Sequence, residues 1–211
     1  MGGTPVIAIV DYGMGNLGSI HNMLNRIGAD SVVTSDPGVI GSAGKIILPG
    51  VGAFDRAMES LRGLGLLPVL REKVLGERTP FLGICLGMQL LSRRSEEGTL
   101  PGLGWIDAEV VRFRWDDGHA GLKVPHMGWN TIEVRTPSPL LHDMYPTPRF
   151  YFVHSYHVRC ADEGCVLATA RYGITFHAAV VQGNIMGTQF HPEKSHKFGL
   201  KLLQNFAEMS A

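Results

Sequence analysis

Short apolar runs alternate with amphipathic stretches along the first half of the chain. Residues 5–10 form a continuous apolar run rich in β-branched side chains, which predicts a strand buried on both faces. Further strands are predicted over 31–34, 45–48 and 80–84, and apolar spacings of three and four predict helices over 17–27, 53–61, 67–75 and from 86. Because strands that alternate with helices build parallel sheets, this half predicts an α/β arrangement with both faces covered.

The second half is dominated by strand patterns. The predicted strands cover 108–113, 130–134, 150–153, 166–170, 178–182 and 185–190, and Gly183-Asn184 is a hairpin signal between the last two. A final helix is expected to begin near Ser195 and to bury Phe198, Leu202, Leu203 and Phe206. We therefore predict one α/β domain over residues 1–211: a mostly parallel central sheet flanked by helices, with an additional mixed or antiparallel patch.

Composition and charge narrow the class of protein. Apolar residues make up 45% of the chain and charged residues 18%, so a folded core is expected. The 19 basic and 19 acidic side chains balance, which argues against nucleic acid or a membrane surface as partner. No apolar run is long enough to span a membrane, and residues 1–4 lack the basic start of a signal peptide. With only three cysteines, a reduced, cytoplasmic protein is expected.

Cys85 lies between two glycines where a predicted strand turns into a helix. In Gly83-Ile-Cys-Leu-Gly87, the glycines remove the clashes that would prevent a sharp turn from exposing the central side chain. The helix that follows directs backbone amides toward the sulfur, which favours a thiolate. A buried structural cysteine is the alternative; the strand–turn–helix context favours a nucleophile, with the Leu86 amide as oxyanion donor.

A candidate base and its orienting acid lie at the end of the last predicted strand. If residues 189–193 are extended, His191 and Glu193 point to one side, so the carboxylate can hold one ring nitrogen and leave the other for a thiol. Together with Cys85 they would form a nucleophile–base–acid triad. Taken alone, the segment is better interpreted as a turn with Pro192 and two solvated polar groups; pairing with Cys85 favours the triad.

Other residues are weaker candidates. Gln89, one helical turn after Cys85, faces the same side, and the loop after residue 48 could bring a backbone amide to the same sheet edge. His126, His154 and His157 lack the spacing of metal ligands, so no metal is expected.

A glycine-rich turn near the start offers a competing interpretation. Gly13-Met-Gly-Asn-Leu-Gly18 follows a strand and opens a helix, as a dinucleotide-binding turn does, and Asp36 is placed as a ribose-binding acid. Against this, the Asp11 carboxylate just before the glycines would repel a pyrophosphate. We expect no cofactor, and take a non-catalytic dinucleotide-binding module as a rival hypothesis.

The two motifs resemble those of the class I, or triad, glutamine amidotransferases: Gly83-Ile-Cys-Leu-Gly-Met-Gln89 and Gln189-Phe-His-Pro-Glu193. Four more stretches narrow the resemblance to the glutamine amidotransferase subunits of imidazole glycerol phosphate synthases. They are Asp11-Tyr-Gly-Met-Gly-Asn-Leu-Gly-Ser19, Leu48-Pro-Gly-Val-Gly-Ala-Phe54, Val124-Pro-His-Met-Gly-Trp-Asn130 and Phe152-Val-His-Ser-Tyr156. The resemblance runs from the first strand to the last helix and implies a flavodoxin-like sheet.

The resemblance also implies a role for each site residue. Cys85 would attack the carboxamide of glutamine, His191 would move the proton, and Glu193 would orient His191. The oxyanion donors would come from Val51, Gly52 and Leu86, and the amino-acid end of glutamine would lie against Gln89, Glu97, Val153, His154 and Ser155.

A partner is implied as well. The subunit would form a heterodimer with a (βα)8-barrel cyclase, which receives the ammonia through a channel and joins it to a phosphoribulosyl-formimino carboxamide ribonucleotide. The products would be imidazole glycerol phosphate and an aminoimidazole carboxamide ribonucleotide, in histidine biosynthesis. The turn over residues 11–19 would then belong to the active-site rim and partner face.

Two points stay open from the sequence. A peptide over residues 50–52 that points its carbonyl inward would leave the oxyanion hole incomplete, so we hypothesise a nearly inactive free subunit. A stand-alone cysteine hydrolase with the same triad is the main rival enzyme, and a catalytically dead scaffold is disfavoured because all three triad residues are present.

Overall fold

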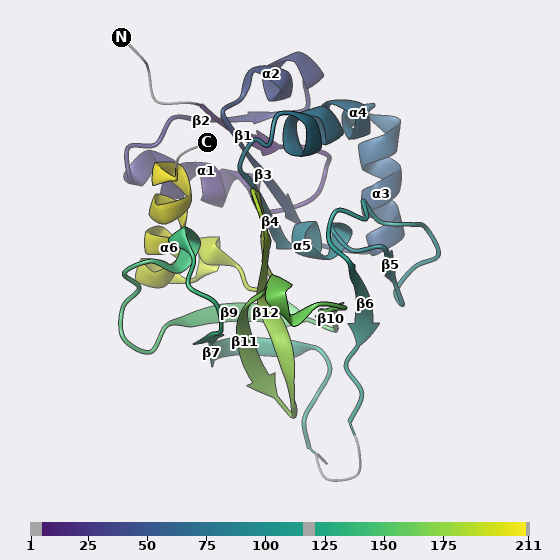
Figure 1. Ribbon diagram of the computed structural model, residues 1–211, viewed down its shortest axis with the longest axis vertical. Helices are drawn as coiled ribbons and strands as arrows, with labels where there is room; N and C mark the ends of the chain where they lie inside the picture. The colour runs from purple at the N-terminus through teal and green to yellow at the C-terminus, as the bar shows by residue number, and fades with distance from the viewer. Residues whose placement is uncertain (1–5, 116–120, 210–211) are drawn as a thin grey trace.

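One large mixed sheet runs through the computed structural model, which describes residues 6–115 and 121–209 (Figure 1). Its main path of strands is β2-β1-β3-β4-β13-β12-β10-β6-β5, with β11 and β8 attached at β12, and β7 and β9 form a separate pair. Pro5, where the sequence predicts the first strand to begin, and residues 1–4 lie outside this part of the chain. The predicted α/β class with a parallel and an antiparallel portion is confirmed, but the antiparallel portion continues the same sheet.

Five parallel strands form one half of the large sheet. Each pairs in parallel with its neighbour, and the buried residues of β1, β3 and β4 explain their continuous apolar runs. The strands are β2 (Ser31–Thr34), β1 (Ile7–Val10), β3 (Lys45–Gly50), β4 (Phe81–Cys85) and β13 (Ile185–Thr188).

Helices cover both faces of this parallel half. On one face pack α2 (Pro37–Ser42), α3 (Phe54–Gly63), α4 (Leu66–Arg71), the π-helical turn η1 (Glu72–Gly76) and α5 (Leu86–Leu90). On the other face lie α1 (Leu17–Arg26) and α6 (His196–Glu208), which contact each other (Figure 1). Phe198, Leu202, Leu203 and Phe206 are buried in α6, as the sequence predicts.

Antiparallel strands extend the sheet beyond β13. The turn at Gly183, where φ is +60°, joins β12 to β13 in the predicted hairpin. The strands are β12 (Ile174–Gln182), β11 (Val166–Tyr172), β10 (Tyr156–Cys160), β8 (Glu133–Val134), β6 (Ala108–Arg112) and β5 (Arg94–Ser95), the last parallel to β6; the separate pair is β7 (His126–Thr131) and β9 (Arg149–His154). Three short 3-10 turns, η3 (Pro139–Leu141), η4 (Glu163–Cys165) and η5 (Pro192–Lys194), complete the described elements.

Several expectations from the pattern were wrong at the level of single elements. The predicted helix over 67–75 is α4 followed by η1, and the strand predicted over 130–134 is divided between β7 and β8. The last strand ends at Thr188 and not at residue 190, since the chain there leaves the sheet toward β9. Within residues 6–115 and 121–209, no helix is both long and apolar enough to cross a membrane.

Candidate active site

Cys85 ends β4 in a strained conformation. Its φ is +54° and its ψ is −108°, and α5 begins at the next residue. The two flanking glycines are required sterically: a Cβ at Gly83 would lie 2.6 Å from the Gly87 carbonyl oxygen, and one at Gly87 would overlap the carbonyl of Leu48. The predicted sharp strand–helix turn is therefore present, and its strain costs on the order of 1–3 kcal/mol.

His191 is brought beside this turn by the neighbouring strand. Because β13 pairs in parallel with β4, with Thr188 opposite Ile84, both chains leave the sheet at the same edge. His191 donates from Nδ1 to Glu193 Oε1 at 2.8 Å. The contact matches the expectation, but its expected cause was wrong: residues 192–194 form the 3-10 turn η5, not an extended segment.

Charge on His191 is favoured by its two neighbours. Burial opposes the imidazolium, but the neighbouring Cys85 and Glu193 side chains outweigh it and raise the pKa of His191 well above its ordinary value. Nε2 makes no hydrogen bond of normal geometry to any described residue. The Glu193 carboxylate sets this direction, because its contact with Nδ1 is short and both side chains are only 2% exposed.

The Cys85 sulfur and the His191 ring line a cavity of about 320 Å³. Most of the residues that the sequence singles out share this cavity: Val51, Gly52, Leu86, Gln89, Glu97, Val153, His154 and Ser155. Glu193 lies behind His191, outside the cavity lining. Pro125 and Tyr156 also line the cavity and were not predicted. Both lie in motifs that carry the family resemblance, but the local sequence pattern does not show that they face Cys85.

Two lining residues already have protein partners. Glu97 accepts from the Phe54 amide at 3.0 Å, and burial raises the pKa of its carboxyl group. His154 is almost fully enclosed, with Nδ1 2.8 Å from the Tyr156 carbonyl oxygen, and burial holds its pKa well below the usual value. These contacts fix the side chains in the cavity wall.

The glycine-rich turn after β1 does not resemble a prepared phosphate site. The Asp11 carboxylate accepts the Gly13 amide at 3.0 Å and so occupies a donor that a phosphate would need. Asp36, the candidate ribose-binding acid, instead caps α2 by accepting from the Gly38 amide at 2.7 Å. Both residues have local structural roles, which weakens the dinucleotide interpretation.

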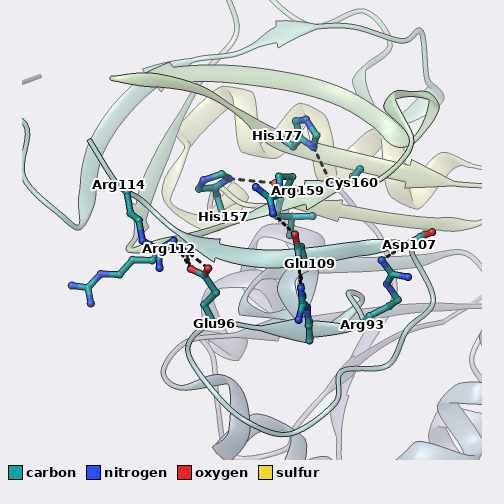
Figure 2. Close-up of polar contacts among 12 residues, drawn as sticks. Arg93, Glu96, Asp107, Glu109, Arg112, Arg114, His157, Arg159, Cys160 and His177 are labelled. Carbon is teal, nitrogen blue, oxygen red and sulfur yellow. Dashed lines mark hydrogen bonds and ion pairs between the residues drawn. The ribbon is translucent and has the colours of Figure 1, made fainter. Parts of the chain in front are cut away.

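A larger cavity of about 530 Å³ lies elsewhere, along β6, β10 and β12. Figure 2 shows two of its three arginines beside carboxylates: Arg114 pairs with Glu96, and Arg159 pairs with Glu109. These contacts support a structural role for this part of the sheet. In the described part of the chain, no three His, Cys, Asp or Glu side chains gather as metal ligands.

Comparison with known proteins identifies the class. The family model described as class-I glutamine amidotransferase matches residues 8–209. The chain therefore belongs to the class I glutamine amidotransferase family. Its fold is similar to a solved glutamine amidotransferase (TM-score 0.70, 22% identity, 96% of this chain and 99% of that one). It is also similar to PurLQS from Thermotoga maritima (TM-score 0.72, 17% identity, 97% and 98%).

Curated relatives show to which group of class I glutamine amidotransferases the chain is similar. The chain is 52% identical over 205 residues to imidazole glycerol phosphate synthase subunit HisH 2 of Methanococcus maripaludis, covering 97% of this chain and all of that one. It is 50% identical over 204 residues to HisH 2 of Pseudomonas aeruginosa, with the same coverage. Within its class the chain thus groups with the HisH subunits, and it is a glutamine amidotransferase.

Proposed function

We propose that Cys85, His191 and Glu193 hydrolyse glutamine and that the ammonia serves imidazole glycerol phosphate synthesis. The observation that carries this proposal is the buried His191–Glu193 contact beside the Cys85 turn, at the wall of one cavity. The identity to HisH subunits supports the pathway.

The reaction follows from the positions of these groups. The Cys85 thiolate attacks the carboxamide carbon of glutamine; the C–N bond breaks, and His191 gives its proton to the leaving nitrogen, so that ammonia departs and a glutamyl thioester remains. His191 then takes a proton from water, whose oxygen attacks the thioester carbon. The C–S bond breaks, glutamate leaves, and the thiolate is restored, while Glu193 keeps the ring oriented.

Gln89 can offer the substrate only an acceptor. Its Nε2 group donates to the Tyr156 carbonyl and to Gln189 Oε1, both at 3.1 Å, so both of its hydrogens are used. We infer that Gln89 Oε1 accepts from the α-ammonium group of glutamine. The α-carboxylate then needs donors elsewhere, and Val153, His154 and Ser155 supply the facing wall.

The oxyanion donors in this proposal are the amides of Leu86 and of the Val51–Gly52 segment. This segment follows β3 directly, and its glycine has a φ of +103°, which lets the peptide turn at low cost. A partner that reorients it would complete the oxyanion hole, and one missing donor typically costs about 10²–10³ in rate.

Exposed apolar side chains near the cavity support a partner. Met127 and Trp129 on β7 are 62% and 44% exposed, and Val51 at the cavity is 44% exposed. Apolar groups of this size are stabilised by a covering protein surface. We assign this covering to a (βα)8-barrel cyclase subunit in a heterodimer, which takes up the ammonia. The free thiols of Cys85, Cys160 and Cys165 fit the reducing cytoplasm.

The test is glutamate release from glutamine by the chain alone and with the cyclase subunit and its nucleotide ligand. We expect a stimulation of about 10²–10³, because the partner completes the oxyanion hole. Cys85→Ala should abolish release, while Cys165→Ala, at a half-buried thiol away from the cavity, should keep the stimulated rate. Full activity without the cyclase would instead indicate a stand-alone hydrolase.

A further inference from the structure

Gln189 is a second neighbour of the Cys85 sulfur. It lies between the end of β13 and His191 and is completely buried. Its Nε2 group is 3.6 Å from Cys85 Sγ, within hydrogen-bond distance for the large sulfur atom. A neutral donor therefore meets the nucleophile from a side chain other than His191.

The orientation of the Gln189 amide follows from its surroundings. A backbone carbonyl is always an acceptor, so the Gln89 atom that lies 3.1 Å from the Tyr156 oxygen must be the amide nitrogen Nε2. The same nitrogen lies 3.1 Å from the Gln189 side chain, whose facing atom must therefore be Oε1. The Nε2 group of Gln189 is then turned toward the sulfur.

A second line of hydrogen bonds ends at the same Tyr156 carbonyl. Asn130 Nδ2 donates to the carbonyl of Arg171 at 2.9 Å, which identifies it as the nitrogen, and it also lies 3.3 Å from His126 Nε2. His126 Nε2 must then be the acceptor, so its Nδ1 group donates to His154 Nε2 at 3.0 Å. His154 Nδ1 in turn donates to Tyr156. The carbonyl that orients both glutamines is thereby held from two sides.

We propose that Gln189 is a catalytic residue that stabilises the Cys85 thiolate by donating an N–H···S hydrogen bond; this rests on the proposed glutaminase function. A hydrogen bond to an anion is about twice as strong as one to a neutral group. The donor therefore favours the thiolate over the thiol before glutamine binds. The hydrogen bond becomes weaker when the sulfur is part of a neutral thioester. It becomes stronger again when the thiolate leaves in the second step.

A purely structural role for Gln189 makes a different prediction. If Gln189 served only to hold Gln89, replacing either residue would weaken binding of the substrate to a similar extent. The reactivity of the Cys85 thiol would stay unchanged. If it stabilises the thiolate, changes at Gln189 should slow the reaction of Cys85 with a small electrophile that uses no substrate pocket.

The experiment measures alkylation of Cys85 by iodoacetamide in the full chain at pH 7, with peptide mass spectrometry to separate it from Cys160 and Cys165. Gln189→Met, which removes the donor, should slow alkylation about tenfold. Gln189→Glu, which keeps the size and places an acceptor against the sulfur, should slow it at least as much. Gln89→Met keeps the Gln189 donor and removes only a contact that orients it, so it should slow alkylation less than Gln189→Met does.

Gln204→Met, at a half-buried position of α6 whose side chain contacts Glu208, is the matched control and should react like the unchanged chain. Unchanged alkylation in a folded Gln189→Met or Gln189→Glu protein would overturn the proposal. If neither variant folds, the side-chain amide signals of ¹⁵N-glutamine-labelled chain decide: the Gln189 signal should shift when Cys85 is alkylated, and an unmoved signal overturns the proposal. Neither readout involves glutamine hydrolysis, so the proposed function can fail without affecting them.

Discussion

Residues around Cys85 are fixed by contacts that leave little room for substitution. Gly50 lies opposite Cys85 in the β3–β4 register, and a Cβ there would overlap the Tyr12 hydroxyl and lie 2.9 Å from Leu86 Cβ. Tyr12 is 1% exposed, and its hydroxyl has no hydrogen-bond partner among the described residues. Burial, followed by the charge of Cys85, raises the pKa of this phenol far above its normal value. The ring therefore acts as a neutral packing element.

Tyr12→Phe should stabilise the protein. The substitution keeps the ring over Gly50 and removes a buried hydroxyl without a partner, so the free energy of unfolding should rise by about 1 kcal/mol. Urea denaturation measures this change. Tyr145→Phe is the control, because that ring is 43% exposed and should show no effect. A loss of stability at Tyr12 would mean that its hydroxyl has a partner after all.

Ion pairs help to hold the short strand β5 at the edge of the sheet. Glu109 on β6 lies opposite Arg94 of β5 and pairs with it at 2.6 Å. It also lies opposite Arg159 of β10 and pairs with it (Figure 2). Since β5 has only two residues, it must be held by these two ion pairs and by the flanking backbone hydrogen bonds. Those bonds run from the Arg93 and Glu96 amides to the β6 carbonyls, both at 2.9 Å.

Glu109→Gln should loosen β5 while the rest of the sheet keeps its protection. Loss of the charge weakens both pairs, and we expect amide exchange at Arg93 and Glu96 to quicken by about threefold to fivefold. Hydrogen exchange followed by NMR gives the rates. Glu133→Gln serves as the comparison, because it removes an exposed ion pair with Arg135 at β8, away from β5. Equal protection of β5 in both variants would show that the two ion pairs contribute nothing there.

Short elements were the hardest to predict at this scale. The six-residue α2 has one buried side chain, Ile40, and so lacks a helical period. The strand β10 contains a buried His157 and an exposed Arg159, and these polar residues hide the strand, which pairs with β6 and β12. The parallel strands were predictable because burial on both faces makes each a continuous apolar run.

Across the whole molecule, buried neutral histidines make stability depend on pH. Burial lowers the pKa of His157 from 6.5 to about 4, and the pKa values of His126 and His154 are lowered as well. Nearby Arg159 and His177 lower the pKa of His157 further, whereas Glu96 and the Val158 carbonyl raise it. Below pH 6.5 these histidines are protonated in the unfolded chain but remain neutral in the folded chain. The free energy of unfolding therefore decreases as the pH falls from about 6.5 toward 4.

His157→Phe should flatten this dependence. The ring lies 4.7 Å from Phe113 between centroids, so phenylalanine fits the site, and it removes one proton uptake on unfolding. Between pH 7 and 4 the variant should lose less stability than the unchanged chain, by on the order of 2 kcal/mol. Urea titrations across this range supply the slopes. His142→Phe, at a 72% exposed side chain, should keep the original slope; a parallel curve for His157→Phe would contradict the assignment.

Long-range contacts set the limit of prediction for the site as a whole. The Cys85 turn is a local motif, and the His191–Glu193 pair is two residues apart, so both were visible in the sequence. Gln189 stands in the same motif as His191, but its approach to Sγ depends on the β4–β13 register and on Tyr156. The roles of the individual residues and the single domain over residues 1–211 stay predictions.

The β4–β13 register also has a consequence for synthesis of the protein. Cys85 leaves the ribosome about a hundred residues before His191, and the two meet only when β13 pairs with β4. A nascent chain with β4 formed therefore carries the proposed nucleophile without its proposed base. His191 follows the last described strand, so a chain that ends before it lacks the proposed base and should release no ammonia.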